Sequence, residues 1–139
     1  MKKIVFVCLG NICRSPMAEF VMKSLTDQLK IESRATSSWE HGNPIHRGTQ
    51  AIFKKYAIAY DRDKTSQQIS PADFADFDYI IGMDESNVRD LKRMAPEDFQ
   101  HKIYQFEEES VPDPWYTGDF DQTYDLVLAG CKKWLERLD

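Results

Sequence analysis

Apolar residues fall along this chain in two patterns, short unbroken runs and longer stretches with helical spacing. The first run, IVFV at residues 4–7, is β-branched or aromatic and has no polar interruption. Such a run is typical of a strand buried on both faces of a parallel sheet. Apolar side chains then recur at helical spacing from Met17 to Leu29, so we expect a helix across that stretch.

The alternation of strand-like and helical stretches continues to the end of the chain. The remaining elements are strands near residues 34–36, 79–81 and 102–104, helices after Arg47, Glu85 and Phe120, and a short helix capped by Ser70. This order predicts an α/β fold, with a parallel sheet and helices on both of its faces. At 139 residues, without an internal repeat, linker or low-complexity segment, the chain fits one domain over residues 1–139.

Residues 8–16, CLGNICRSP, join the first strand to the first helix in a tight loop. Gly10 and Asn11 are residue types that tolerate left-handed backbone conformations, so the loop can curl until its N–H groups converge. Ser15 supplies an N-cap hydroxyl and Pro16 suits the first helical position, so the helix is expected to begin where the loop ends. Converging amides at a helix N-terminus bind anions, and the loop is therefore predicted to hold a phosphate.

Cys8 and Arg14 stand at opposite ends of this loop. A helix N-terminus, converging amides and a nearby guanidinium all favour the thiolate, which makes Cys8 a candidate nucleophile. Arg14 can offer two parallel N–H groups to two phosphoryl oxygens and keep that geometry in the transition state, so it is predicted to bind and to catalyse. The alternative is structural, with Cys8 a small buried apolar residue and Arg14 a surface charge.

Charge and composition narrow the classes of function. A formal net charge of −5 argues against sequence-independent nucleic-acid binding, although it does not exclude an anionic substrate at a locally positive site. No segment is long and apolar enough for membrane insertion, and three cysteines without a signal peptide favour a cytoplasmic setting. His41, His46 and His101 lack metal-ligand spacing and are expected to be ordinary surface or loop residues, so no metal and no cofactor is predicted.

Three segments resemble a known family. Residues 7–16 (VCLGNICRSP) closely resemble the nucleophile loop of low-molecular-weight protein tyrosine phosphatases, and residues 84–87 (DESN) and 113–115 (DPW) agree with further segments of that family. The resemblance extends over essentially the whole chain. It implies a single doubly wound domain with a four-stranded parallel sheet, and hydrolysis of phosphotyrosine and small aryl phosphates without a metal.

Asp113 is the predicted general acid. A phenolate leaving group needs a proton as its phosphorus–oxygen bond breaks. Asp113 lies between two prolines and beside aromatic residues, which would stiffen the backbone and partly desolvate the carboxylate. Composition alone favours a proline-rich surface turn with a solvated aspartate. The resemblance favours the acid, because the family places its acid in an Asp-Pro-aromatic segment.

The resemblance implies a mechanism in two steps. Cys8 attacks the phosphorus while Asp113 protonates the departing phenol, and the resulting phosphocysteine is hydrolysed by water that Asp113 activates. Arg14 and the loop hold the phosphoryl oxygens throughout, and Ser15 donates a hydrogen bond to the sulfur in addition to capping the helix. The predicted phosphate-binding residues are Leu9, Gly10, Asn11, Ile12, Cys13 and Ser15.

Three aromatic residues are predicted to wall the substrate slot. Trp39 stands in a polar loop that contains glycine and proline, and Trp115 and Tyr116 follow the predicted acid. Together they would form a slot deep enough for a phenyl ring, so that phosphotyrosine reaches Cys8 and phosphoserine falls short. The alternative is that the rings merely cover a small part of the core.

The resemblance also assigns residues that brace the loop. Asn11 is expected to bond to Ser33 and Asp84, which keeps the amides aimed inward. For Asp84 the alternative is capping of the helix that follows. The sequence departs from the mammalian pattern at Lys64, near which those relatives carry a histidine. Because lysine cannot accept a hydrogen bond, we expect Lys64 to act as a cation directed at Asp84, unless the loop is braced differently.

The two other cysteines are assigned different roles. In the family, a cysteine placed like Cys13 captures the oxidised nucleophile as a disulfide, which protects a reactive thiolate from irreversible oxidation. A structural, buried Cys13 is the alternative. Cys131 shares the last helical stretch with Tyr124, Leu128 and Leu135, and is predicted to lie in the core.

Two further functions compete with the phosphatase. Arsenate reductases use the same loop fold, but thioredoxin-linked members need resolving cysteines, and residues 82–95 contain none. A non-catalytic phosphotyrosine-binding module would need neither Cys8 nor Asp113. The phosphatase is therefore preferred, with tyrosine-phosphorylated proteins as partners and a cognate tyrosine kinase as its counterpart. Phosphorylated sugars and phosphoarginine are the alternative substrates.

Overall fold

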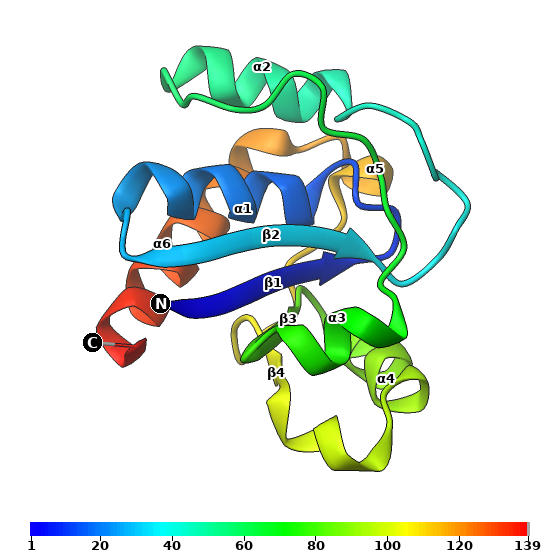
Figure 1. Cartoon of the computed structure of the whole chain (residues 1–139). Coiled ribbons are helices and arrows are strands. Elements are labelled where there is room, and N and C mark those ends of the chain that lie inside the picture. Colours follow the sequence, from blue (N-terminus) through cyan, green and yellow to red (C-terminus); the bar gives the residue numbers. More distant parts are fainter. Residues whose placement is uncertain (139) are drawn as a thin grey trace.

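The four strands form one open sheet. In the computed structural model of the chain, which describes residues 1–138, they are β1 (Lys2–Cys8), β2 (Leu29–Ala35), β3 (Tyr79–Gly82) and β4 (Ile103–Gln105). They lie in the order β2-β1-β3-β4, and every neighbouring pair is parallel (Figure 1). The predicted four-stranded parallel sheet is confirmed, and β1 lies in its interior.

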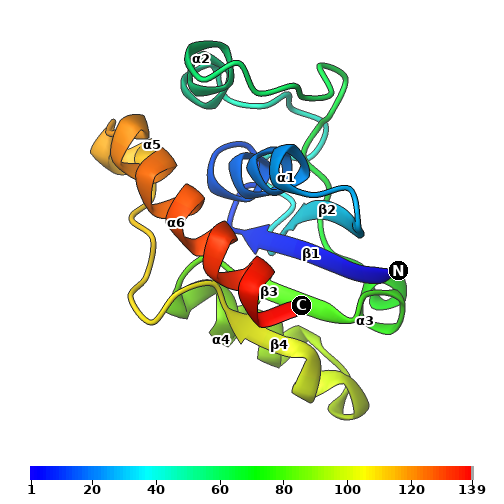
Figure 2. The ribbon, with the colours of Figure 1, turned by 90° about the vertical axis from the view of Figure 1, so that its left-hand side faces the viewer.

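Helices cover both faces of this sheet (Figure 2). The long helices are α1 (Arg14–Leu25), α2 (Arg47–Lys55), α4 (Glu85–Met94) and α6 (Phe120–Leu138), and the short ones are α3 (Pro71–Asp76), the 3₁₀ helix η1 (Glu97–Lys102) and α5 (Pro114–Thr117). Successive side chains of β1 point to opposite faces, so Phe6 packs in the core with α1, α2 and α6, and Val7 packs with α3 and α4. The doubly wound arrangement is confirmed. Within residues 1–138 no helix is long and apolar enough to cross a membrane.

The first helix is shorter than its apolar spacing suggests. α1 ends at Leu25, and Leu29, which continues the helical spacing, is instead the first residue of β2. Thr26 has an extended backbone, and its Oγ1 accepts a hydrogen bond from the Gln28 N–H as the chain turns toward the sheet. The prediction of a helix up to Leu29 is wrong. The apolar side chain of Leu29 packs against the same core as α1, but it does so from a strand.

The start of α1 also differs from the prediction. Arg14 is the first helical residue, and Cys13 takes the N-cap position without a side-chain hydrogen bond. Ser15 therefore lies inside the first turn and is not the cap. The backbone N–H of Ser15, one of the free N–H groups in the first turn of α1, donates to Cys8 Sγ at 3.4 Å. The sulfur of Cys8 thus takes the place of a capping hydroxyl. The cap predicted at Ser70, in contrast, is confirmed at the start of α3, where Ser70 and Asp73 form a capping box.

Gly130 lets α6 pack closely against the segment that follows β4. A Cβ atom at this position would lie 2.2 Å from the buried ring of Phe106. We expect Gly130→Ala to lower the free energy of unfolding by up to about 2 kcal/mol, because a clash that costs about 1–3 kcal/mol outweighs the ~1 kcal/mol by which alanine favours a helix over glycine. Urea denaturation measures the change, with Asp125→Ala on the exposed face of α6 as the control for helix propensity. Equal stability of Gly130→Ala and the wild type would contradict this account.

Candidate active site

The loop between β1 and α1 curls around the sulfur of Cys8. The N–H groups of Asn11 and Ser15 both donate to Sγ, at N···S distances of 3.3 and 3.4 Å. Asn11 makes the curl with a left-handed φ of 55°. Gly10 does not share this conformation. Its missing side chain matters for packing instead, because a Cβ atom there would lie 3.3 Å from Cγ of Glu40.

Cys8 combines burial with an environment that favours negative charge. Its side chain is nearly closed off from solvent and belongs to the core beneath α1. Ser15 Oγ lies 3.1 Å from Sγ, and it donates to the Arg34 carbonyl at 3.4 Å. The two backbone N–H donors stabilise a thiolate, because hydrogen bonds to a charged group are stronger than those to a neutral one. Cys8 therefore has the surroundings that a nucleophile needs.

Arg14 is buried, so the alternative of a surface charge is wrong. Its Nη1 donates to Asp84 Oδ2 at 2.6 Å and to the Val111 carbonyl at 2.9 Å, and Nη2 donates to Asp113 Oδ2 at 3.4 Å. Burial opposes the guanidinium charge, but Cys8 and the two carboxylates outweigh it and raise the pKa of Arg14. Its buried Nε–H has no acceptor in the described part of the chain, so a donor remains for a bound oxyanion.

The bracing residues contact one another differently from the prediction. Asn11 Nδ2 donates to Ser15 Oγ at 2.8 Å and to Ser33 Oγ at 3.0 Å. The expected bond from Asn11 to Asp84 is wrong, because both oxygens of Asp84 serve other groups. Oδ2 accepts from Arg14, and Oδ1 accepts from the Asn87 N–H at 2.7 Å and caps α4. Asp84 thus supports the loop through Arg14 and caps a helix at the same time.

Lys64 contacts a different carboxylate from the one expected. Its Nζ donates to the Ser33 carbonyl at 2.8 Å and lies 4.0 Å from Oε1 of Glu19, a buried residue of α1. Burial lowers the pKa of Lys64, and Glu19 opposes that effect. The predicted contact between Lys64 and Asp84 is wrong, because Asp84 lies against Arg14. Lys64 instead holds the backbone of β2.

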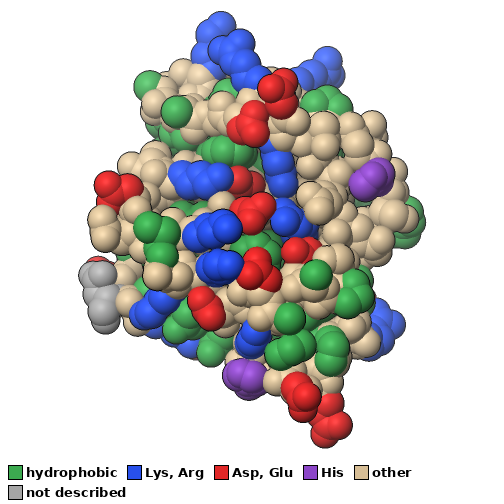
Figure 3. Space-filling view, viewed as in Figure 1, with side chains coloured by type: hydrophobic (Ala, Val, Ile, Leu, Met, Phe, Trp, Pro, Cys, Tyr) green, Lys and Arg blue, Asp and Glu red, His purple; other side chains and the backbone are tan. Residues whose placement is uncertain are grey.

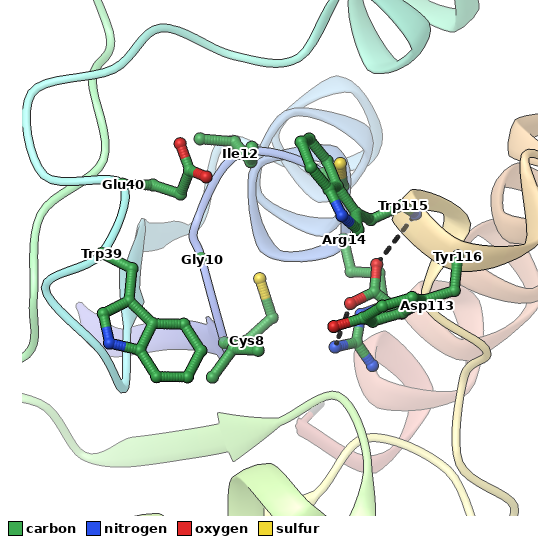
Figure 4. Close-up of a pocket in the computed structure, with 11 residues that line it drawn as sticks. Cys8, Gly10, Ile12, Arg14, Trp39, Glu40, Asp113, Trp115 and Tyr116 are labelled. Carbon is green, nitrogen blue, oxygen red and sulfur yellow. Dashed lines mark hydrogen bonds and ion pairs between the residues drawn. The ribbon is translucent and has the colours of Figure 1, made fainter.

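Asp113 lies at the start of α5, between Pro112 and Pro114. Its Oδ1 accepts from the Trp115 N–H at 3.0 Å, and its Oδ2 faces Arg14 (Figure 4). The side chain is 21 % exposed. The segment is therefore a short capped helix, not a solvated surface turn, and its carboxylate is held in one orientation.

A pocket lies over the loop, with Asp113 on one side (Figure 4). Three aromatic side chains line it, and Trp39, Trp115 and Tyr116 are 77 %, 56 % and 77 % exposed. Rings this exposed do not cover the core, so that alternative is wrong for all three. Trp39 comes from the segment after β2, and the other two come from α5, on the opposite side of Cys8.

Glu40 and His46 belong to the site although the sequence does not single them out. Glu40 lines the pocket beside Trp39. Its position next to Trp39 in the sequence is the one local feature that could have indicated its place in the site. His46 donates its backbone N–H to the Ile12 carbonyl at 2.8 Å, and its ring packs edge-on against Trp115 at a centroid distance of 5.5 Å. Since His46 bridges segments far apart in the sequence, no local pattern reveals it.

All three cysteines are free and buried. Cys13 lines the pocket together with Cys8, and burial, reinforced by the neighbouring Cys8, raises its pKa. Capture of an oxidised Cys8 by Cys13 as a disulfide stays a prediction. Cys131 lies in the core on α6, as predicted, and burial raises its pKa.

These features define a class of protein, a single α/β domain whose anion-binding loop holds a cysteine and a buried arginine opposite a carboxylate. The chain belongs to the low-molecular-weight phosphotyrosine protein phosphatase family, whose sequence model matches residues 3–139. It is accordingly a phosphatase, an enzyme of the hydrolase class.

Individual members of the family are similar to this protein over nearly its whole length. The chain is 45 % identical over 141 residues to the low-molecular-weight protein-tyrosine-phosphatase PtpA of Staphylococcus aureus, which covers 94 % of this chain and 90 % of PtpA. The PtpA of Staphylococcus epidermidis is 43 % identical over 142 residues, with the same coverage of 94 % and 90 %. The fold is similar to the crystal structure of SP-PTP, a low-molecular-weight protein tyrosine phosphatase from Streptococcus pyogenes. The TM-score is 0.98 and the identity 63 %, over 100 % of this chain and 94 % of that one.

Proposed function

We propose that this protein hydrolyses phosphotyrosine in proteins, and small aryl phosphates, through a phosphocysteine intermediate. The supporting observation is that Cys8, Arg14 and Asp113 line one pocket, although Arg14 and Asp113 are 99 positions apart. A structural role for the loop, or simple anion binding, does not require a carboxylate opposite a thiol.

In the first step, the Cys8 thiolate attacks the phosphorus in line with the departing phenolic oxygen. The sulfur–phosphorus bond forms as the phosphorus–oxygen bond breaks, and Asp113 gives its proton to the leaving oxygen. Arg14, already oriented by Asp84 and the Val111 carbonyl, stabilises the equatorial oxygens together with the loop N–H groups.

In the second step, water hydrolyses the phosphocysteine. Asp113, now ionised, accepts a proton from the water as its oxygen attacks the phosphorus. The sulfur–phosphorus bond breaks, and Cys8 departs as the thiolate. Ser15 Oγ, 3.1 Å from Sγ, donates a hydrogen bond to that thiolate and improves it as a leaving group. The product is inorganic phosphate.

The exposed rings around the pocket support selection of an aromatic phosphoester. We expect Trp39→Ala to lower kcat/KM for a phosphotyrosine peptide about 10-fold, because the ring would lose one stacking face worth ~1.4 kcal/mol. Inhibition by inorganic phosphate should not change, since phosphate has no ring to stack against Trp39. Trp39→Phe, which keeps a ring, is the matched control and should stay near the wild type. An equal loss of phosphate inhibition in Trp39→Ala would instead indicate a damaged loop.

Activity assays with matched substrates test the proposal. The purified protein is expected to prefer a phosphotyrosine peptide over the matching phosphoserine peptide about 100-fold or more in kcat/KM. Phosphoarginine, a sugar phosphate and arsenate in the same preparation test the alternatives. A preference for any of these, or no hydrolysis of phosphotyrosine, would overturn the proposed substrate. Capture of phosphoproteins by the Cys8→Ser protein would then identify the natural partners and the tyrosine kinase that opposes it.

A further inference from the structure

His46 differs from the other two histidines in its surroundings. His41 and His101 are exposed, and Figure 3 shows histidine side chains on the surface near the right and lower edges of that face. His46 is instead partly buried, where the start of α2 meets α5 and the first residue of α6. His46 is therefore more than an ordinary surface residue, and the mechanism above gives it no role.

The first turn of α2 is fixed to the anion-binding loop through two hydrogen bonds. The backbone N–H of His46 donates to the Ile12 carbonyl at 2.8 Å, and the Thr49 hydroxyl donates to the Cys13 carbonyl at 3.2 Å. Thr49 and the two loop residues are buried, so solvent does not compete for these bonds. The start of α2 therefore keeps a fixed place relative to the loop that ends at Arg14.

The side chain of His46 contacts the segment that carries the predicted acid. Its ring stacks on Phe120, the first residue of α6, at a centroid distance of 5.2 Å and an interplanar angle of 18°. It meets the ring of Trp115, in α5, at 5.5 Å and 80°. The N–H of Trp115 in turn donates to Asp113 Oδ1 at 3.0 Å. One imidazole ring thus contacts the chain before and after Gly118, where α5 ends.

Two features fix the orientation of this ring. Nδ1 accepts from the Gly48 N–H at 2.9 Å and caps α2, which ties the imidazole to its own helix. Gly48 also lets Phe120 approach, since a Cβ atom there would lie 2.4 Å from that ring. The ring of His46 is therefore held by α2 on one side and by Trp115 and Phe120 on the other.

Other contacts hold α5 only weakly. Pro114 is the one buried residue of this short helix, and the side chain of Trp115 is largely exposed. The bond from Arg14 Nη2 to Asp113 Oδ2 is 3.4 Å long, whereas an N–H···O bond is typically about 2.9 Å. The place of α5 over the loop therefore depends largely on the rings that contact His46.

We propose that His46 is a positioning residue that sets the distance between the acid segment and the anion-binding loop. The bond to Ile12 fixes His46 to the loop, and the contacts with Trp115 and Phe120 fix the acid segment to His46. Asp113 then stands at the leaving oxygen of a phosphoester whose phosphate the loop holds. The inference rests on the proposed function, in which Asp113 is the general acid.

The leaving-group dependence of His46→Ala tests the inference. Displacement of the acid should lower kcat/KM for phosphotyrosine about 10-fold, because the acid must stay within hydrogen-bond reach of the leaving oxygen. For p-nitrophenyl phosphate, whose leaving group needs less protonation, we expect a loss below about threefold. Inhibition by inorganic phosphate should not change, since alanine keeps the backbone bond to Ile12. An equal loss with both substrates, or wild-type kcat/KM with both in a folded His46→Ala protein, would overturn the inference.

Two exchanges at the same position separate the ring from the cap. His46→Phe keeps a ring but has no acceptor for the Gly48 N–H, whereas His46→Asn keeps an acceptor and has no large ring. His46→Phe should recover most of the activity toward phosphotyrosine, and His46→Asn should resemble His46→Ala. The opposite order would mean that the histidine only caps α2, which contradicts the inference. His101→Ala, at an exposed position of η1, is the matched control and should leave both substrates unaffected.

Combination with Asp113→Asn shows whether His46 acts through the acid. In that background His46→Ala should lower kcat/KM for phosphotyrosine no further, and an equal loss in both backgrounds would contradict the inference. If His46→Ala does not fold, Phe120→Leu decides, since it removes the stacked ring from the opposite side. It should show the same substrate-dependent loss, and equal losses or none would overturn the inference.

Amide hydrogen exchange separates this inference from the proposed function. The N–H groups of Trp115 and Gly118 are bonded within the acid segment, to Asp113 Oδ1 and to the Pro114 carbonyl. We expect their exchange to be about 10-fold faster in His46→Ala, and exchange in α4 to be unchanged. If exchange accelerates but the wild type hydrolyses no aryl phosphate, the proposed function fails and positioning by His46 stands. If hydrolysis proceeds and His46→Ala changes neither exchange nor the leaving-group dependence, only the inference about His46 fails.

Discussion

Replacement of Cys8 by serine is expected to abolish turnover and to preserve phosphate binding. A serine hydroxyl is a poorer nucleophile than a thiolate, so kcat for p-nitrophenyl phosphate should fall about 10⁴-fold or more. The N–H groups of Asn11 and Ser15 and the buried guanidinium of Arg14 remain in place. Inorganic phosphate should therefore bind within about threefold of its wild-type affinity. Release of p-nitrophenol and calorimetric titration with phosphate measure the two quantities.

Cys131→Ser is the matched control for this exchange. It makes the same chemical change at another buried site, where Sγ lies 3.8 Å from the Ala18 carbonyl and does not line the pocket. We expect it to keep kcat near the wild type. Turnover by Cys8→Ser within about tenfold of the wild type would rule out the phosphocysteine. Loss of phosphate binding together with turnover would mean that the sulfur holds the loop in shape, because two N–H groups converge on it.

The features that the sequence predicts well are those set by neighbours in the chain. The apolar run at residues 4–7 forms the interior strand, and Ser70 caps α3, because burial on both faces and side-chain capping leave local patterns. The loop from Cys8 to Arg14 is similarly compact in sequence. Its residues enclose one anion site because a strand end and a helix start are only a few residues apart.

Two errors concern contacts between distant segments. Whether Asp84 bonds to Asn11 or to Arg14 depends on where β3 ends relative to the loop, which no local pattern encodes. Lys64 reaches Glu19 because a long irregular segment runs back beside β2. Leu29 is misassigned for a related reason, since its apolar side chain fits the same core from a helix or a strand. Burial alone therefore does not decide the element that a residue joins.

Asp113→Asn is expected to lower kcat/KM, and to lower it most for substrates whose leaving group most needs a proton. The amide can keep the bond from the Trp115 N–H and so preserve α5, but it cannot donate a proton as an acid. We expect kcat/KM for phosphotyrosine to fall about 10²–10⁴-fold, the range attributed to general acid catalysis. For p-nitrophenyl phosphate, whose leaving group needs less protonation, the loss in kcat/KM should be smaller.

A series of aryl phosphates with graded phenol acidities makes this prediction quantitative. The logarithm of kcat/KM should depend more steeply on leaving-group acidity in Asp113→Asn than in the wild type, because only the wild type neutralises the departing phenolate. Asp119→Asn, which removes the same charge from a neighbouring capping residue, is the control and should follow the wild-type dependence. Parallel lines for Asp113→Asn and the wild type would mean that the carboxylate orients Arg14, to which it is bonded at 3.4 Å, and that another group supplies the proton.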